Sequence, residues 1–355
     1  MPTQLETGHV YNFAYRGDRA YADDEYLPAF PQPTLAPAPF TVRDHPQDDD
    51  AYYIRVVKGS DDAEAPVLLW VHGGSILSGS AAFAIYDPAV FAKALGCTII
   101  SVNYRLGLAS RPRTADGGLA FDRDCFAVED VLAAFERGKQ FLRDSGETFD
   151  RVFLGGHSVG ATMIFGIAER FAHEVNGVIA ATPILEPLYA ADRSALVARH
   201  DTDSASLAMS APERVEFQQT MVDEWVAGEH GAEVLGLWRP QFGETSYPWE
   251  NESWRLPLPL FATWSEGEYA EYGDVLKARA ADQASKPGDI MRPIEIDDRF
   301  GLNARQMHLA AIPIFFGNED DWQGSMLDEY VASDDYQPAH IALTTEIRQW
   351  MAAQQ

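Results

Sequence analysis

Residues 150–168 place the strictest constraint on how this chain can fold. The run 152–154 is short and apolar, as is typical of a buried strand. Residues 156–160, with the sequence Gly-His-Ser-Val-Gly, follow at once, and an apolar segment with helical spacing comes after them. The stretch therefore reads as strand, sharp turn and helix, with Ser158 at the turn.

This context favours Ser158 as a nucleophile. The two flanking glycines leave room for a strained turn that holds the hydroxyl clear of the backbone. The helix that follows would place its N-terminal N–H groups near an oxygen on which negative charge develops. The alternative is a glycine-rich turn whose serine only caps a helix, and the strand before it and helix after it count against that alternative.

The rest of the chain alternates between strand-like and helix-like segments. Strands are expected at 51–58, 66–71, 97–102, 177–184, 258–264 and 294–296, and helices at 91–95, 124–143, 272–283 and 341–351. Repeated strand–helix units predict an α/β fold with a mainly parallel sheet and helices on both faces. Residues 1–50 read as an extended N-terminal segment, and residues 186–257 interrupt the alternation.

Composition excludes several classes of partner. The chain has 355 residues, and 27 basic against 54 acidic side chains give it a net charge of −27. Such a surface repels nucleic acid and anionic membranes, so a small-molecule substrate is the better expectation. No stretch has the apolar length of a membrane span, the first residues lack a signal-peptide pattern, and only two cysteines are present. We therefore expect a cytoplasmic protein; its oligomeric state is left open.

Several motifs together resemble the type-B carboxylesterases of the α/β-hydrolase fold. They are PVLLWVHGGSILSGSA at 66–81, SVNYRLG at 101–107, the helix around Asp130, and LGGHSVGA at 154–161, with Tyr15-Arg16-Gly17 as an N-terminal element. The 86 residues from His72 to Ser158 also match the spacing in that family. The C-terminal third is more similar to smaller esterases of the hormone-sensitive-lipase and kynurenine-formamidase kind.

The resemblance implies an oxyanion hole made by backbone N–H groups of Gly74, Ser75 and Val159. Each such donor can be worth about 3 kcal/mol when a negative oxygen forms during attack on an ester. The sequence departs from the family at Ser75, where a third glycine is usual. The resemblance implies no cofactor and no metal.

A serine hydroxyl needs a base, and the fold orders the triad as serine, acid, histidine. Of the histidines after Ser158, His308 lies in a stretch similar to the family's histidine segment, and His340 is the alternative. The acid should follow the strand 258–264, where Glu266 and Glu268 both occur. The smaller esterases carry their acid a few residues past that strand, which favours Glu268. Arg105 is expected to be structural and to pair with a buried carboxylate.

The insertion at 186–257 is rich in large apolar side chains, among them Trp225 and Trp238. In this fold an insertion between the sixth and seventh strands carries a cap over the site. We therefore expect a helical cap whose tryptophans line an apolar pocket, on a core formed by 51–185 and 258–355. The alternative is that these tryptophans are the ordinary core of a helical subdomain.

These inferences predict a serine hydrolase that cleaves a carboxylic ester through an acyl-enzyme intermediate. An amide or lactone hydrolase similar to an arylformamidase would use the same residues. A binding protein that kept the fold without catalysis is the alternative from another class, and the intact Ser158 turn argues against it.

Overall fold

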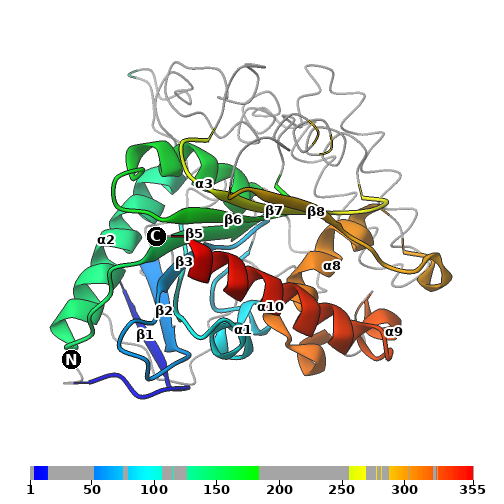
Figure 1. The fold of residues 1–355 in the computed structure, drawn as a ribbon, viewed down its shortest axis with the longest axis horizontal. Helices are drawn as coiled ribbons and strands as arrows, with labels where there is room; N and C mark the ends of the chain where they lie inside the picture. Colours follow the sequence, from blue (N-terminus) through cyan, green and yellow to red (C-terminus); the bar gives the residue numbers. More distant parts are fainter. Residues whose placement is uncertain are drawn as a thin grey trace.

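Figure 1 shows the computed structural model of the chain. It describes residues 4–14, 52–74, 79–105, 126–183, 256–268, 288–302, 304–322 and 327–354, and the single residues Ala115, Lys277, Ala281 and Ser325. Strand-forming and helix-forming segments alternate through these ranges, as the sequence predicts.

The described strands form one eight-stranded sheet in the order β1-β2-β4-β3-β5-β6-β7-β8. Their bounds are β1 Val10–Ala14, β2 Tyr53–Lys58, β3 Val67–Val71, β4 Thr98–Val102, β5 Val152–His157, β6 Gly177–Ala181, β7 Leu260–Ser265 and β8 Ile290–Ile294. Strand β2 runs antiparallel to both of its neighbours, β1 and β4, and all other pairs are parallel. The carboxyl ends of β3, β5, β6 and β7 therefore meet at one edge of the sheet.

Helices cover both faces of this sheet (Figure 1). The α-helices are α1 Ala89–Leu95, α2 Phe126–Asp144, α3 Val159–Arg170, α8 Ala304–Phe316, α9 Asp328–Val331 and α10 Tyr336–Ala353, with short 3-10 helices at η2 Ala84–Tyr86, η5 Asp298–Phe300 and η6 Glu319–Trp322. Helices α2 and α3 pack on one face, and α1, α8 and α10 pack on the other.

Strand β3 shows why helices must pack on both faces of the sheet. Leu69 and Val71 point into the core shared with α2 and α3, whereas Leu68 and Trp70 point into the core shared with α1, α8 and α10. All five residues of β3 are buried, as expected of a central parallel strand with an apolar side chain at every position. The predicted α/β class with a mainly parallel sheet is confirmed.

Several predicted boundaries were wrong, and the largest shifts are those of β8 and α10. The strand expected at 294–296 is β8 at Ile290–Ile294, which lies at the sheet edge and is only half-buried. Its burial pattern is weak for that reason, and an edge strand also tolerates Pro293. Helix α10 begins five residues before the expected 341, at Tyr336, which is buried in its first turn.

The predicted role of Arg105 is confirmed. Its guanidinium makes two contacts with the fully buried Asp130 carboxylate, from Nε at 2.7 Å and from Nη2 at 2.9 Å. The backbone N–H of Arg105 also donates to Asp130, at 3.0 Å. This ion pair ties the chain just after β4 to helix α2, so the structure gives Arg105 a role in the fold.

The proposed domain division stays a prediction. Most of the segment 1–50, residues 186–255 of the expected insertion at 186–257, and most of the expected helix at 272–283 lie outside the described residues. In the part of the chain that is described, no helix combines the length and the apolar character that a membrane crossing requires.

Candidate active site

Ser158 lies at a strained turn between β5 and α3. Its backbone φ is +55° and ψ is −126°, a conformation that residues other than glycine rarely adopt. Its N–H donates to the carbonyl of Ala181 at 3.0 Å, which holds the turn against the end of β6. The sequence prediction of a sharp strand-to-helix turn at this serine is confirmed.

The two glycines of the turn are required by close backbone contacts. A Cβ at Gly156 would lie 2.7 Å from the backbone nitrogen of Ala161, and a Cβ at Gly160 would lie 2.3 Å from the carbonyl oxygen of Val71. A side chain at either position would push α3 away from β5 or β3. The two glycines therefore allow α3 to pack closely against β5 and β3, and this packing fixes the position of Ser158 at the turn.

The structure brings Ser158, His308 and Glu268 into one hydrogen-bonded chain. His308 Nε2 lies 3.0 Å from Ser158 Oγ, and His308 Nδ1 lies 2.8 Å from Glu268 Oε2. All three residues are buried. Three separate elements supply them: the β5–α3 turn, the loop after β7, and helix α8.

Glu268 is itself held in place. Its Oε1 accepts a hydrogen bond from the N–H of Ser265 at 3.1 Å, and its own N–H donates to the carbonyl of Ser265, also at 3.1 Å. Gly267 has φ +87°, so the tight turn between them needs a glycine. An ionised Glu268 can then accept from Nδ1–H of His308 and leave Nε2 free to accept a proton from the serine.

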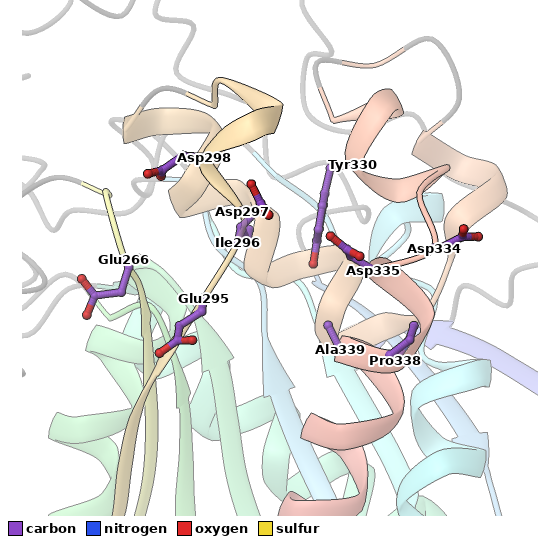
Figure 2. A pocket seen from close by; sticks show the side chains of 10 residues that line it. All are labelled: Glu266, Glu295, Ile296, Asp297, Asp298, Tyr330, Asp334, Asp335, Pro338 and Ala339. Carbon is purple, nitrogen blue, oxygen red and sulfur yellow. The ribbon is translucent and has the colours of Figure 1, made fainter.

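Glu266, the alternative acid, lies elsewhere. Its carboxylate accepts from Trp264 Nε1 at 3.3 Å and pairs with Lys277 Nζ at 3.3 Å, and it is about half exposed. Figure 2 shows it lining a cavity together with other acidic side chains, including Glu295 and Asp335. Glu266 and Glu268 are only two positions apart in the sequence, yet the Glu268 carboxylate contacts His308 and the Glu266 carboxylate faces solvent.

His340, the alternative base, is a packing residue. Its ring is buried between α10 and α8, and its Nδ1 hydrogen-bonds the carbonyl of Ile314 at 2.9 Å. Burial lowers the pKa of His340, so it stays neutral at pH 7. The structure does not bring it to Ser158. His308 itself lies inside α8, which starts at Ala304.

The glycine-rich loop after β3 lies against the serine turn. A Cβ at Gly73 would come within 2.6 Å of His157 Nδ1 and 3.0 Å of Ser158 Cβ, and Gly74 has φ +114°. Val159 is the first residue of α3, so its N–H has no acceptor within the helix. Gly73, which precedes Gly74, thus lies against Ser158, and Val159 follows Ser158 directly in the chain. Ser75, and the predicted pocket residues Trp225 and Trp238, lie outside the described residues.

Sequence reasoning missed two side chains at this site. His157, the last residue of β5, hydrogen-bonds Tyr86 Oη through Nδ1 at 3.0 Å and the carbonyl of His308 through Nε2 at 3.3 Å. Strand alternation could have placed His157 on the sheet face opposite Gly156, under α8. Nothing in the sequence marks Tyr86 as its partner.

Two buried histidines beside the Ser158 turn, His72 and His157, stay uncharged at neutral pH. Burial lowers the pKa of His72 to about 4, and burial together with nearby His308 lowers the pKa of His157 well below its usual range. Ring stacking of His72 on Tyr104, with centroids 4.4 Å apart, accompanies that burial. In the described part of the chain, no group of three or more His, Cys, Asp and Glu side chains is arranged to hold a metal ion.

His72 should make the folded state acid-sensitive. The pKa of His72 is about 4 in the folded protein, against an ordinary value of 6.5. Between these two pH values, His72 is therefore protonated to a greater extent in the unfolded chain than in the folded one. The free energy of unfolding should therefore fall as the pH drops from 6.5 towards 4, by up to roughly 3 kcal/mol from this residue. Urea titrations across this range measure the fall. The His72→Asn variant keeps a donor for Gly73 and cannot titrate, so it should show a shallower pH dependence; identical dependence in both proteins would contradict the assignment.

Comparison with known proteins agrees with this fold. Residues 68–228 match the sequence model of a family described as having the alpha/beta hydrolase fold. A hyperthermophilic esterase from the archaeon Pyrobaculum calidifontis has a similar structure, with a TM-score of 0.51 and 15% identity, over 85% of this chain and 82% of that one. The chain therefore has the α/β-hydrolase fold, and the predicted resemblance to esterases of that fold is confirmed.

Two curated relatives are similar over shorter stretches. The probable N-octanoylanthranilate hydrolase of Rhodococcus erythropolis is 37% identical over 106 residues, which are 28% of this chain and 21% of that protein. The gibberellin receptor of Oryza sativa subsp. japonica is 33% identical over 111 residues, which are 31% of this chain and 28% of the receptor. The chain thus spans less than a third of either relative.

Proposed function

We propose that this protein hydrolyses carboxylic esters of small molecules through an acyl-enzyme intermediate, with Ser158 as nucleophile, His308 as general base and Glu268 as the acid that orients it. The observation that carries the proposal is the chain of two hydrogen bonds, 3.0 Å from Ser158 to His308 and 2.8 Å from His308 to Glu268. A base within hydrogen-bond reach of the nucleophile, itself oriented by a third group, meets the geometric requirement for this chemistry.

The steps follow from those contacts. Ser158 Oγ attacks the ester carbonyl while His308 Nε2 takes its proton, and Glu268 stabilises the imidazolium that forms. Backbone N–H groups of Gly74, Ser75 and Val159 receive the negative oxygen of the tetrahedral intermediate. His308 then returns the proton to the leaving alcohol. A water molecule, activated by the same imidazole, cleaves the acyl-enzyme and restores Ser158.

The insertion completes the proposal. It enters the chain between β6 and β7, whose carboxyl ends border the serine turn. We assign residues 186–257 to a cap over the core formed by 51–185 and 258–355, with Trp225 and Trp238 in the substrate pocket. An apolar cap would favour substrates with an apolar acyl or alcohol group.

Two relatives define the alternatives. One is named as a hydrolase of an N-acyl compound, which favours an amide hydrolase using the same three residues. The other is named as a receptor, which represents a binding protein on the same fold. The hydrogen-bonded Ser158 and His308 favour catalysis over binding alone.

A substrate panel tests the proposal. The kcat/KM values for p-nitrophenyl acetate, butyrate and octanoate would be compared with those for the matching anilides and for small lactones. We expect the p-nitrophenyl esters to give the highest values. Faster anilide or lactone turnover would replace the ester assignment with the corresponding alternative, and no turnover in any series would contradict hydrolysis altogether.

The acid assignment gives a matched pair of variants. Glu268→Gln keeps the size of the side chain but removes the charge that stabilises the imidazolium, so kcat for p-nitrophenyl acetate should fall by about 10³- to 10⁴-fold. Glu266→Gln changes a half-exposed carboxylate paired with Lys277, so its kcat should stay within about twofold of the parent. The opposite ranking would make Glu266 the acid.

A further inference from the structure

The residue before the nucleophile belongs to a hydrogen-bond relay that the proposed chemistry does not use. Gly73 N–H lies 3.3 Å from Tyr86 Oη, Tyr86 Oη lies 3.0 Å from His157 Nδ1, and His157 Nε2 lies 3.3 Å from the carbonyl oxygen of His308. Tyr86, His157 and His308 are all buried. These contacts join residues that are distant in sequence, in the loop after β3, in η2, at the end of β5 and in α8.

The partners fix the direction of every hydrogen bond. The Gly73 N–H can only donate and the His308 carbonyl can only accept. His157 must therefore carry its proton on Nε2 and donate it to that carbonyl, which leaves Nδ1 as an acceptor. Tyr86 then donates its hydroxyl proton to Nδ1 and accepts from Gly73. Each donor and acceptor is matched only if His157 is neutral and Tyr86 is protonated.

Burial enforces those two protonation states. It raises the pKa of Tyr86, and it lowers the pKa of His157, so neither is charged at neutral pH. A neutral His157 also matters electrostatically because its ring centroid lies 5.2 Å from that of His308. A cation at that distance would oppose the positive charge that His308 must carry after it takes the serine proton.

The two ends of the relay are next to groups that the proposed reaction requires at fixed distances from Ser158. One end is Gly73, next to the oxyanion donor Gly74, and the other end is the backbone of His308. The middle, His157, is covalently bonded to Ser158. A fixed relay of this kind would hold nucleophile, base and oxyanion loop in one register.

We propose that Tyr86 and His157 are positioning residues that hold the glycine loop and the backbone of His308 in register with Ser158. This inference rests on the proposed function. Neither side chain touches the substrate carbonyl or transfers a proton to it; both act through Gly73 and His308. Their removal should therefore lower kcat while leaving substrate binding, and hence KM, nearly unchanged.

Three variants test the inference. His157→Leu removes both hydrogen bonds, and Tyr86→Phe removes the hydroxyl that joins the ring to Gly73. His157→Gln offers an amide that can donate to the His308 carbonyl and accept from Tyr86. For p-nitrophenyl acetate we expect kcat to fall on the order of 10²-fold in His157→Leu and about tenfold in Tyr86→Phe, with KM within about threefold. We expect His157→Gln to recover to within about fivefold of the parent.

His340→Leu is the matched control. His340 is also a buried histidine bonded through one ring nitrogen to a carbonyl of α8, that of Ile314. Its loss should lower the urea midpoint of unfolding about as much as His157→Leu does, while kcat stays within about twofold of the parent. This separates a loss of register from a general loss of stability.

The possible results distinguish a failure of the proposed function from a failure of the relay. A parent protein that neither turns over p-nitrophenyl acetate nor reacts with an organophosphate contradicts the proposed function itself. An active parent with kcat unchanged in His157→Leu and Tyr86→Phe overturns the relay. It is also overturned if His157→Gln is as impaired as His157→Leu, or if His340→Leu loses kcat to the same extent. A His157 variant that does not fold leaves Tyr86→Phe to decide between these results.

Discussion

Replacing Ser158 with alanine should reduce turnover of p-nitrophenyl acetate by at least about 10⁴-fold and leave the fold intact. The reason is that the proposed acyl-enzyme forms on Ser158 Oγ, the atom that lies 3.0 Å from His308 Nε2. The change removes only one buried oxygen, and alanine is no worse than serine at the positive φ of this turn. Turnover is measured with purified protein, and far-UV circular dichroism and thermal melting report the fold.

Ser145→Ala is the control for this variant. Ser145 is fully buried near the end of α2, and the turnover of this variant should equal that of the parent. Turnover by Ser158→Ala comparable to the parent would remove Ser158 from the mechanism. A loss of activity accompanied by a lower melting temperature would instead point to unfolding.

Replacing His308 with alanine should lower kcat by about the same factor, because nucleophile and base act as one unit. Its Nε2 is 3.0 Å from Ser158 Oγ, and without it the hydroxyl has no base. His340→Ala removes a ring whose contact is the carbonyl of Ile314, so it should cost stability and leave kcat within about twofold. Steady-state kinetics and urea unfolding of both variants measure the two effects.

Double substitution provides a sharper check on His308. Because Ser158 and His308 are proposed to act together, Ser158→Ala with His308→Ala should be no slower than either single variant. Additive losses would mean that the two residues contribute independently. Full activity in His308→Ala together with a large loss in His340→Ala would transfer the role of base to His340.

The serine turn could be predicted from sequence because its determinants are local. The glycines at 156 and 160 are demanded by backbone contacts with neighbouring residues and strands, and such contacts leave a five-residue signature. The alternation of strands and helices likewise predicts helices on both faces of the sheet. The structure agrees, because every residue of a strand such as β3 is buried. Local pattern therefore accounts for most of the fold that is described.

The partners of Ser158 depend on contacts that are distant in sequence. Glu266 and Glu268 follow the same strand and have the same chemistry; the tight turn at Gly267 and the N–H of Ser265 decide which one faces His308. Tyr86 and His157 are 71 residues apart and meet only because η2 packs beside the end of β5. A contact of this kind cannot be predicted from the periodicity of charged or apolar residues in the sequence.

Covalent labelling tests the central claim most directly. The protein would be incubated with diisopropyl fluorophosphate, which transfers a phosphoryl group to an activated serine, and its intact mass and proteolytic peptides would be measured. We predict one adduct per chain, on the peptide that contains Ser158, at a rate that falls by several orders of magnitude in His308→Ala. No adduct under conditions that label a known serine esterase, or an adduct on a serine other than Ser158, would contradict the account.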